Sequence, residues 1–338
     1  MKQIVYIANG TSENIEVWSL CQNGDMNLLQ QVSTNGQIQP MRIVKNKNFL
    51  YAGIRPNNKI ITYIIKKNGC LEKKYESFIP GTPNYISFNK TNDFLFCSSY
   101  HSNCLSVSPL NKNGIPEKPI QIIYDIQGCH AARVNYKYNI LFVMSLKEDR
   151  IYLYYLKNFG ILKNTEQKFL KTQNKSGPRH IVFHPNQDFV YTINELNGTI
   201  DVWKINKTNN IIHIKNIQNI NIFNQNNHFA KVYWSSDIQI TSCGRFLYVS
   251  DRLFNTISLF HINKNNKIIF FQSYNTEEQP RSFYIDKTNS YLIVASEKNN
   301  IFTIYNILKG TGELKKLNTY STGNRPVWIL IHQLNYNF

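Results

Sequence analysis

The sequence predicts an all-β protein, a seven-bladed β-propeller with four antiparallel strands in each blade. Three observations predict this fold. A short apolar-aromatic triplet recurs at steps of 45 to 57 residues, a second β-rich run begins eleven residues after the start of six of the seven triplets, and helical periodicity is essentially absent. Repeats of this length, each with several short strands, are typical of propeller blades. The triplets occupy residues 4–6, 49–51, 94–96, 140–142, 189–191, 246–248 and 291–293.

Each repeat contains four short segments of alternating β-branched and aromatic residues, bounded by Asn, Gly and Lys, a pattern typical of antiparallel strands joined by tight turns. The first segment is often opened by proline, as in residues 39–43, 82–86, 177–181 and 279–283. The triplet is the second strand. The third strand lies at residues 15–18, 60–63, 105–107, 151–154, 200–203, 257–260 and 301–305, and residues 211–214 exemplify the fourth.

The two ends of the chain complement each other. The N-terminal repeat has its second and third strands and a further strand near residues 28–32, but it lacks the first strand. Residues 325–331 supply such a strand at the C-terminus, so we expect one composite blade that closes the ring and removes an open sheet edge. The step of 57 residues predicts an insertion, a surface loop, near residues 219–230. We expect residues 1–338 to form a single propeller domain.

Composition restricts the function. The net charge of +17 comes from lysines dispersed beside asparagines in turn-like segments, which favours a solvated basic surface over a nucleic-acid site, although a phosphorylated small substrate also suits a basic protein. The six cysteines are scattered without a C-x-x-C pair, which argues against a zinc site or a disulfide framework. No apolar stretch has the length that spans a bilayer, and the first residues read as a strand. We therefore expect a soluble, cytoplasmic monomer without metal, cofactor, nucleic acid or membrane partner.

Polar residues recur at positions that should share one mouth of the central channel. In an antiparallel blade the start of the first strand and the end of the second lie on the same face. The second-strand ends carry Gly10, Arg55, Tyr100, Leu146 (followed by Lys147), Glu195, Arg252 and Glu297. The first-strand starts carry Asn84, His130, Arg179 (followed by His180), Ser236 (followed by Asp237) and Arg281, with Met41–Arg42 and Val327–Trp328 in the irregular blades. Singly, each is an ordinary exposed residue; together they predict one axial site. His184 falls in a turn on the opposite face, and we interpret it as structural.

Several of these segments resemble a known family. Residues 128–131 (GCHA), 177–186 (GPRHIVFHPN), 194–197 (NELN), 200–203 (IDVW) and 279–281 (QPR) resemble the propeller-type 6-phosphogluconolactonase family, a seven-bladed β-propeller lactonase family, and the likeness extends over nearly the whole chain. The resemblance implies metal-free hydrolysis of 6-phospho-D-glucono-1,5-lactone to 6-phospho-D-gluconate in the oxidative pentose phosphate pathway. The fold is also similar to that of fungal-type muconate lactonising enzymes, whose active residues are a His, a Glu and arginines; the matching positions are His130, Glu195 and Arg179.

Opening a lactone with water requires an activated nucleophile, stabilisation of the tetrahedral oxyanion and a proton for the leaving ring oxygen. The sequence contains no Gly-x-Ser-x-Gly motif, which favours activated water over a covalent acyl-enzyme. Our hypothesis is that His130 or Glu195 activates the water. His130 is preferred as the base because the unperturbed pKa of histidine lies near neutrality. Arg179, with His180 beside it, would stabilise the oxyanion.

The phosphate of such a substrate requires cationic side chains. Arg55, Arg252 and Arg281 are the candidates, because a guanidinium binds phosphate through paired hydrogen bonds. Asp237 is expected to orient an arginine or a sugar hydroxyl.

Two alternative functions stay open at the level of sequence. The first is another lactonase or lactonising enzyme on the same fold, with a substrate that lacks phosphate. The second is a non-catalytic scaffold propeller of the WD40 type that binds proteins on its rim. The absence of the Trp-Asp signature and the concentration of charge at the axis argue against the scaffold, and the arginine excess at the mouth favours a phosphorylated substrate.

Overall fold

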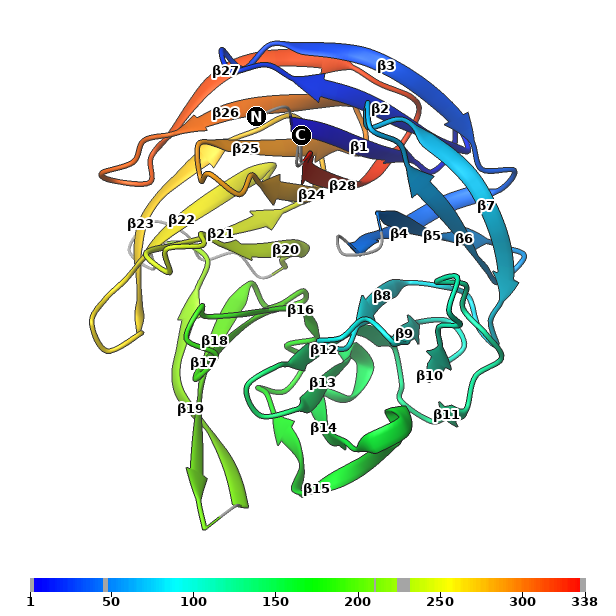
Figure 1. Cartoon of the computed structure of the whole chain (residues 1–338). Helices are drawn as coiled ribbons and strands as arrows, with labels where there is room; N and C mark the ends of the chain where they lie inside the picture. Colours follow the sequence, from blue (N-terminus) through cyan, green and yellow to red (C-terminus); the bar gives the residue numbers. More distant parts are fainter. Residues whose placement is uncertain (1–2, 45–47, 210, 224–231, 335–338) are drawn as a thin grey trace.

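The computed structural model describes residues 3–44, 48–209, 211–223 and 232–334, and within these ranges it has seven four-stranded antiparallel sheets. The sheets are arranged in a ring around a central channel (Figure 1), so the predicted propeller is confirmed. None of the helices in the described ranges is long and apolar enough to cross a membrane.

Strands are given from the centre of the ring outward. Blade 1 contains β28 (Pro326–Gln333), β1 (Gln3–Asn9), β2 (Asn14–Leu20) and β3 (Met26–Ser33). Blade 2 contains β4 (Gln37–Val44), β5 (Phe49–Arg55), β6 (Lys59–Ile65) and β7 (Leu71–Phe78). Blade 3 contains β8 (Tyr85–Phe88), β9 (Phe94–Ser99), β10 (Cys104–Pro109) and β11 (Gln121–Ile123). Blade 4 contains β12 (Cys129–Asn135), β13 (Ile140–Ser145), β14 (Arg150–Leu156) and β15 (Leu162–Lys171), with short 3-10 helices η2 (Leu146–Glu148) and η3 (Asn158–Gly160).

The remaining blades follow the same order. Blade 5 contains β16 (Pro178–Phe183), β17 (Phe189–Asn194), β18 (Thr199–Thr208) and β19 (Ile211–Asn221). Blade 6 contains β20 (Ser235–Ile240), β21 (Phe246–Asp251), β22 (Thr256–Ile262) and β23 (Ile268–Asn275). Blade 7 contains β24 (Pro280–Ile285), β25 (Tyr291–Ser296), β26 (Ile301–Ile307) and β27 (Leu314–Ser321).

The composite blade forms as predicted. β28 pairs with β1 from Gln3↔Gln333 to Ala8↔Trp328, and the two strands lie side by side in Figure 1. The predicted loop at residues 219–230 is wrong at its start, because β19 continues to Asn221. Part of the extra length in this repeat is therefore strand, since β18 and β19 are 10 and 11 residues long. Residues 224–230 of the predicted loop lie outside the described residues.

Each second strand is buried on both faces, which explains its continuous apolar character. Along β1, Ile4 and Tyr6 pack with blade 2, whereas Val5 and Ile7 pack with blade 7. Successive side chains of a strand point to opposite faces, so every residue of the triplet enters a core between two blades. Burial of these side chains stabilises each contact between neighbouring blades.

The first and third residues of the triplet hold a turn of the next blade. The Tyr6 hydroxyl donates to the carbonyl of Gly69, 2.8 Å away, in the turn between β6 and β7. Gly69 has φ +92°, and a Cβ there would lie 2.4 Å from Cγ1 of Ile4, so glycine is required. Tyr51 repeats the contact with Gly114 at 2.6 Å. Where the third residue of the triplet is tyrosine, as in blades 1, 2, 5 and 6, its hydroxyl links adjacent blades in addition to filling the core.

Candidate active site

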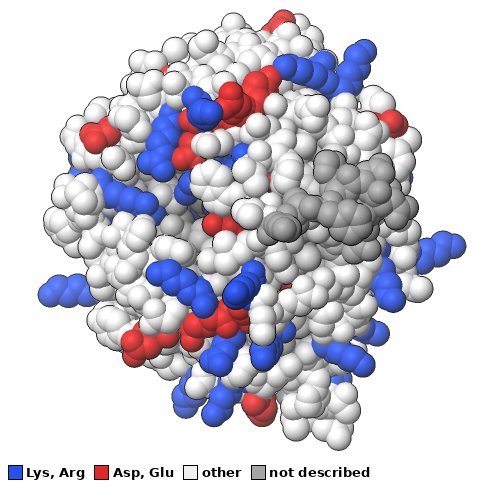
Figure 2. Space-filling view, turned by 180° about the vertical axis from the view of Figure 1, so that it is seen from behind, with Lys and Arg blue, Asp and Glu red and all other residues white. Residues whose placement is uncertain are grey.

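The inner strands of all seven blades begin at one mouth of the channel. Strand pairing places one residue of each blade at the same level there: Gln39, Asn84, His130, Arg179, Ser236, Arg281 and Val327. The residues at the second-strand ends lie on the same face, as predicted. Figure 2 shows this face, with positive and negative side chains gathered around a central hollow.

A β-bulge opens the inner strand of blade 5 and directs two consecutive side chains to the mouth. Pro178 pairs with Asn194 and His180 pairs with Ile193, so Arg179 has no partner on β17. In a regular strand Arg179 and His180 would point to opposite faces. Here Nη1 of Arg179 lies 3.2 Å from Nε2 of His180. Blades 4, 6 and 7 have the same irregularity at the starts of their inner strands.

Blade 2 departs from the prediction. Its register passes from Ile38↔Ile54 to Met41↔Ala52, so the bulge lies between Ile38 and Met41 and the mouth position is Gln39. Nε2 of Gln39 donates to Oδ1 of Asn84 at 3.1 Å. The prediction that Met41–Arg42 lie at the mouth is wrong, because both residues follow the bulge, in regular pairing with Ala52 and Tyr51, and Met41 is fully buried in the core between blades 1 and 2.

In blade 1 the prediction holds. Trp328 pairs with Ala8, and its ring centre lies 6.0 Å from that of His180. Val327 and Trp328 therefore occupy the mouth positions of blade 1, as expected from the repeat, although the Val327 side chain packs in the core between blades 1 and 2.

A buried ion cluster joins blades 5 and 6. Nε of Arg179 lies 2.7 Å and Nη2 of Arg252 lies 3.1 Å from the same oxygen, Oε2 of Glu195. Both arginine side chains are only 3% exposed and that of Glu195 is 15% exposed. Neither contact has the alignment of a hydrogen bond, whereas Nη1 of Arg179 donates to the carbonyl of Ser236. The guanidinium carbon of Arg252 also lies 3.9 Å from the centre of the Trp234 ring.

His180 is held by Asp237 from blade 6. Nδ1 of His180 lies 2.9 Å from Oδ1 of Asp237, and since a carboxylate only accepts, Nδ1 carries the proton. Nε2 then accepts from Arg179. The other oxygen of Asp237 lies 3.4 Å from the hydroxyl of Ser282 and 3.4 Å from the amide of Phe283. Asp237 therefore contacts His180 rather than an arginine, and its alternative role, orienting a sugar hydroxyl, stays a prediction.

His130 lies against His180, with ring centres 5.2 Å apart. It is 6% exposed, and its Nδ1 has no hydrogen-bond partner among the described residues. Burial, followed by the positive charge of Arg179, lowers the pKa of His130 well below its ordinary value. The imidazole is therefore neutral near pH 7, and its buried Nδ1 has no partner in the described part of the chain. We call Arg179, Glu195 and Arg252 together with His130, His180 and Asp237 the inner cluster.

The inner cluster predicts how the fold responds to acid. Burial and the charge of Arg179 lower the pKa of His180 from 6.5 to about 4, although Asp237 opposes this shift. The unfolded chain then binds the proton more readily, so the stabilisation is complete above pH 6.5 and is lost as pH falls toward 4. The loss is about 3 kcal/mol. We expect Tm to fall less steeply between pH 7 and 4 in His180→Asn than in the wild type; parallel curves would contradict this expectation.

A second cluster lies beside the first, and we call it the rim cluster: Arg281, Glu297 and Arg325, with Arg55. Nη1 of Arg281 donates to Oε2 of Glu297 at 3.3 Å, and Nε of Arg325 donates to Oε1 at 2.8 Å. Burial alone would raise the pKa of Glu297, but Arg281 and Arg325 outweigh it and hold that pKa below its ordinary value. Nη2 of Arg55 donates to Asn84 at 3.1 Å.

Arg325 and Gln39 were missed by reasoning from the sequence. Arg325 directly precedes the proline that opens β28 and lies two positions before Val327, the first residue that we expected at the mouth in this blade. The recurring proline at the start of the inner strand could have indicated Arg325. An arginine directly follows this proline in blades 5 and 7, and an arginine directly precedes it in blade 1. In blade 2 the bulge shifted the mouth position by two residues.

Other polar features lie away from the mouth. His184 follows β16 at the opposite end, where its amide donates to the carbonyl of Phe189, so its predicted position is confirmed. The described residues contain no group of three or more His, Cys, Asp or Glu that could hold a metal ion.

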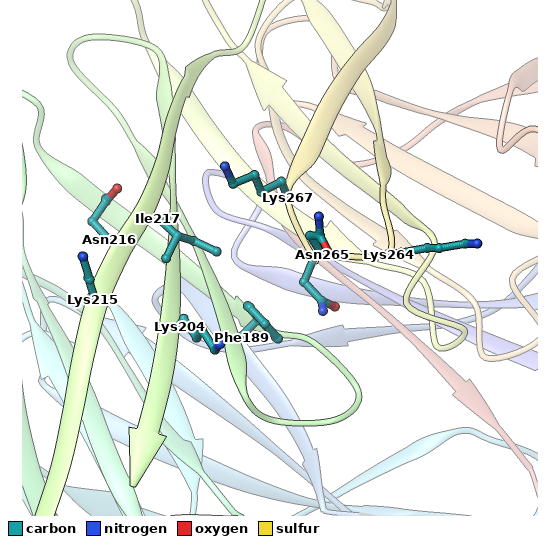
Figure 3. Close-up of a pocket in the computed structure, with 9 residues that line it drawn as sticks. Phe189, Lys204, Lys215, Asn216, Ile217, Lys264, Asn265 and Lys267 are labelled. Atoms are coloured by element: carbon teal, nitrogen blue, oxygen red, sulfur yellow. The ribbon is translucent and has the colours of Figure 1, made fainter. Parts of the chain in front are cut away.

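A groove of about 730 Å³ separates the outer parts of blades 5 and 6 (Figure 3). It is lined by Lys204, Lys215, Lys264 and Lys267 among others. In Figure 3 the Lys267 side chain extends toward β19, but Lys264 points away from the groove. Because these lysines diverge, the groove lacks the convergent polar groups found at the mouth.

Comparison with known proteins agrees with this architecture. Residues 2–331 match the family model described as lactonase, 7-bladed beta-propeller. The chain belongs to this lactonase family. Its relatives include the 6-phosphogluconolactonase of Buchnera aphidicola subsp. Acyrthosiphon pisum (strain 5A), 71% identical over 99% of this chain and 100% of the relative. That of Erwinia tasmaniensis is 38% identical over 99% of this chain and 100% of the relative.

Solved structures share the lactonase fold at low identity. The periplasmic gluconolactonase of Pseudomonas aeruginosa superposes with a TM-score of 0.88 at 17% identity, covering 99% of this chain and 100% of that one. A protein from Lactobacillus plantarum gives 0.87 at 21% identity, covering 98% and 100%. In this member of the lactonase family, two clusters form at the mouth. The inner cluster contains His130, Arg179, His180, Glu195, Asp237 and Arg252, and the rim cluster contains Arg281 and Glu297 among others.

Proposed function

We propose that the chain is a 6-phosphogluconolactonase, which hydrolyses 6-phospho-D-glucono-1,5-lactone to 6-phospho-D-gluconate at the channel mouth. The observation that carries the proposal is the inner cluster. Burying two guanidinium groups and a carboxylate costs free energy that apolar side chains would not, and perturbed titratable groups gather at functional sites. Curated relatives that match over nearly the full chain bear the name of this enzyme.

His130 is the group best suited to activate water. Its imidazole is neutral near pH 7. Its Nδ1 is buried and has no partner among the described residues, so the other ring nitrogen, Nε2, is the candidate proton acceptor. Glu195 is less suited because its carboxylate is within ion-pair distance of two arginines. In the proposed reaction, His130 accepts a proton as the water oxygen attacks the lactone carbonyl carbon. It returns that proton to the ring oxygen as the bond between carbonyl carbon and ring oxygen breaks.

Arg179 supplies the charge that the tetrahedral oxyanion needs. Its guanidinium is fixed by Glu195, by the Ser236 carbonyl and by Nε2 of His180. A donor fixed before the reaction pays no reorganisation cost when negative charge develops. Asp237 fixes the tautomer of His180, and Glu195 positions Arg179 and Arg252 together. Arg55, Arg252 and Arg281 remain the phosphate candidates, of which only Arg252 belongs to the inner cluster.

The decisive experiment is a coupled assay with freshly generated 6-phosphogluconolactone. The purified chain should accelerate hydrolysis above the spontaneous background, and the same assay with glucono-1,5-lactone measures the contribution of the phosphate. A rate equal to background on both lactones would refute the proposal. A clear preference for the unphosphorylated lactone would instead favour a gluconolactonase.

Replacing His130 with alanine should lower kcat about 100-fold, the usual contribution of a general base. Glu195→Gln tests the competing base, because it keeps the shape of the side chain and removes its basicity. If both variants retained near-normal turnover of fresh lactone, neither residue would activate water and this mechanism would be wrong.

The remaining expectations belong to the same proposal. The substrate is a small phosphorylated sugar lactone, and we place the enzyme in the cytoplasm as a monomer with a single propeller domain. No nucleic acid or membrane takes part, since the charged residues that converge do so at the channel mouth.

A further inference from the structure

The charges at the mouth are divided unequally between the two clusters. In the inner cluster the positive charges of Arg179 and Arg252 are matched by two carboxylates: that of Glu195, which both arginines contact, and that of Asp237, which contacts His180. His130 and His180 are neutral. This cluster is therefore electrically balanced.

The rim cluster is not balanced. Arg281 and Arg325 share one carboxylate, that of Glu297. Arg55 adds a third cation: burial, followed by repulsion from Arg281 and Arg325, lowers its pKa to about 10, so it stays charged at pH 7. The rim cluster carries two positive charges in excess. A sugar phosphate carries a charge close to −2 at neutral pH, which matches this excess.

The backbone holds Arg325 in place for such a role. Its φ of +61° lies in the left-handed region, as does that of Gly177 (+66°), the residue that precedes β16 in blade 5. Glycine adopts this conformation without strain and arginine does not. The Arg325 amide donates to Asn300 at 2.8 Å, and its carbonyl accepts from Gly10 at 2.8 Å. These bonds fix the residue on both sides.

The side chain of Arg325 is also the most accessible of the rim arginines. It is 45% exposed, compared with 15% for Arg281. Its one hydrogen bond to a described residue uses Nε, which leaves the two terminal nitrogens directed to no described side chain. Paired terminal nitrogens are the donors with which a guanidinium binds phosphate.

We propose that Arg325 and Arg281, positioned by Glu297 and assisted by Arg55, form the subsite for the substrate phosphate, and that Arg252 does not bind it. The assignment rests on the proposed lactonase function. It gives the rim cluster the phosphate end of the substrate and the inner cluster the lactone end.

The test compares kcat/KM for 6-phosphogluconolactone with that for glucono-1,5-lactone. Arg325→Ala and Arg281→Ala should each lower this ratio at least tenfold, mainly through a higher KM for the phosphorylated lactone, since one charge-assisted hydrogen bond is lost. Arg325→Lys keeps the charge but not the paired donors, and should fall between alanine and the wild type. An unchanged ratio in either alanine variant would overturn the assignment of that arginine.

Arg245→Ala is the matched control. Arg245 is exposed, lies at the opposite end of β21 and donates to the Lys309 carbonyl at 2.8 Å. The substitution removes one positive charge without changing the mouth, so the ratio of kcat/KM for the two lactones should stay at the wild-type value. If the ratio also fell tenfold in this variant, the effect would depend on net charge alone, and the proposal would be overturned.

A binding measurement separates this inference from the proposed function. Calorimetric titration with 6-phosphogluconate and with gluconate should show that only the first ligand loses affinity, at least tenfold, in Arg325→Ala. This readout does not need turnover: absent lactonase activity would refute the function, whereas equal affinity of wild type and Arg325→Ala for 6-phosphogluconate would refute the subsite.

Discussion

Replacing Arg179 with alanine is expected to lower kcat on 6-phosphogluconolactone by about 10²–10³-fold, the usual effect of removing one preorganised oxyanion donor. The guanidinium is 3% exposed and touches Glu195, His180 and the Ser236 carbonyl. Water that fills the space would bring no fixed positive charge to the tetrahedral intermediate. Steady-state kinetics above the spontaneous background measure the effect, and kcat should fall by far more than KM rises.

Two controls separate catalysis from folding. Arg179→Lys restores a charge without the planar donors, so we expect partial recovery of kcat. Arg179→Ala leaves Glu195 within ion-pair distance of Arg252, at 3.1 Å, so the carboxylate is not left without a cation. The thermal unfolding of the variant should therefore stay cooperative. A cooperatively folded Arg179→Ala protein with wild-type kcat would exclude Arg179 from the oxyanion site.

The fold could be predicted because its signal repeats. The triplet at residues 4–6 has apolar residues on both faces of β1, and the aromatic residue at its end also bonds to a turn of the next blade. The apolar pattern recurs in each blade, and the hydroxyl bond recurs in blades 1, 2, 5 and 6, where the last residue of the triplet is tyrosine, so the pattern survives sequence differences between blades. The missing inner strand of blade 1 could be assigned by elimination, because residues 325–331 fitted no other position in the repeat.

The candidate site could be predicted as a location but not as a set of contacts. Antiparallel geometry placed His130, Arg179 and Glu195 on one mouth. The sequence did not indicate that a bulge turns both Arg179 and His180 to that mouth, because regular strand alternation separates neighbouring side chains. Nor did it pair Asp237 with His180, since that contact joins residues of two blades, 57 positions apart in the chain.

Removing β28 is expected to have the largest effect on stability. A chain that ends at Asn324 lacks the inner strand of blade 1, which pairs with β1 along its whole length. Val327, Ile329, Leu330 and Ile331 are each at most 4% exposed. Burying four such side chains contributes about 6–12 kcal/mol, as much as the whole free energy of unfolding of a typical domain. We expect this truncated chain to show no cooperative thermal transition.

A chain that ends at Leu334 is the matched control, because it keeps β28 and the Arg325–Glu297 ion pair. It should show a cooperative thermal transition. The chain that ends at Asn324, in contrast, exposes the edge of β1. The unpaired amides and carbonyls of this edge can pair between molecules, so size-exclusion chromatography of this chain should show oligomers. A monomeric, cooperatively folding chain ending at Asn324 would mean that the remaining six blades and β1–β3 close the ring without β28. It would also contradict the view that the composite blade holds the mouth together, because Arg325 and Trp328 enter the site only through this strand.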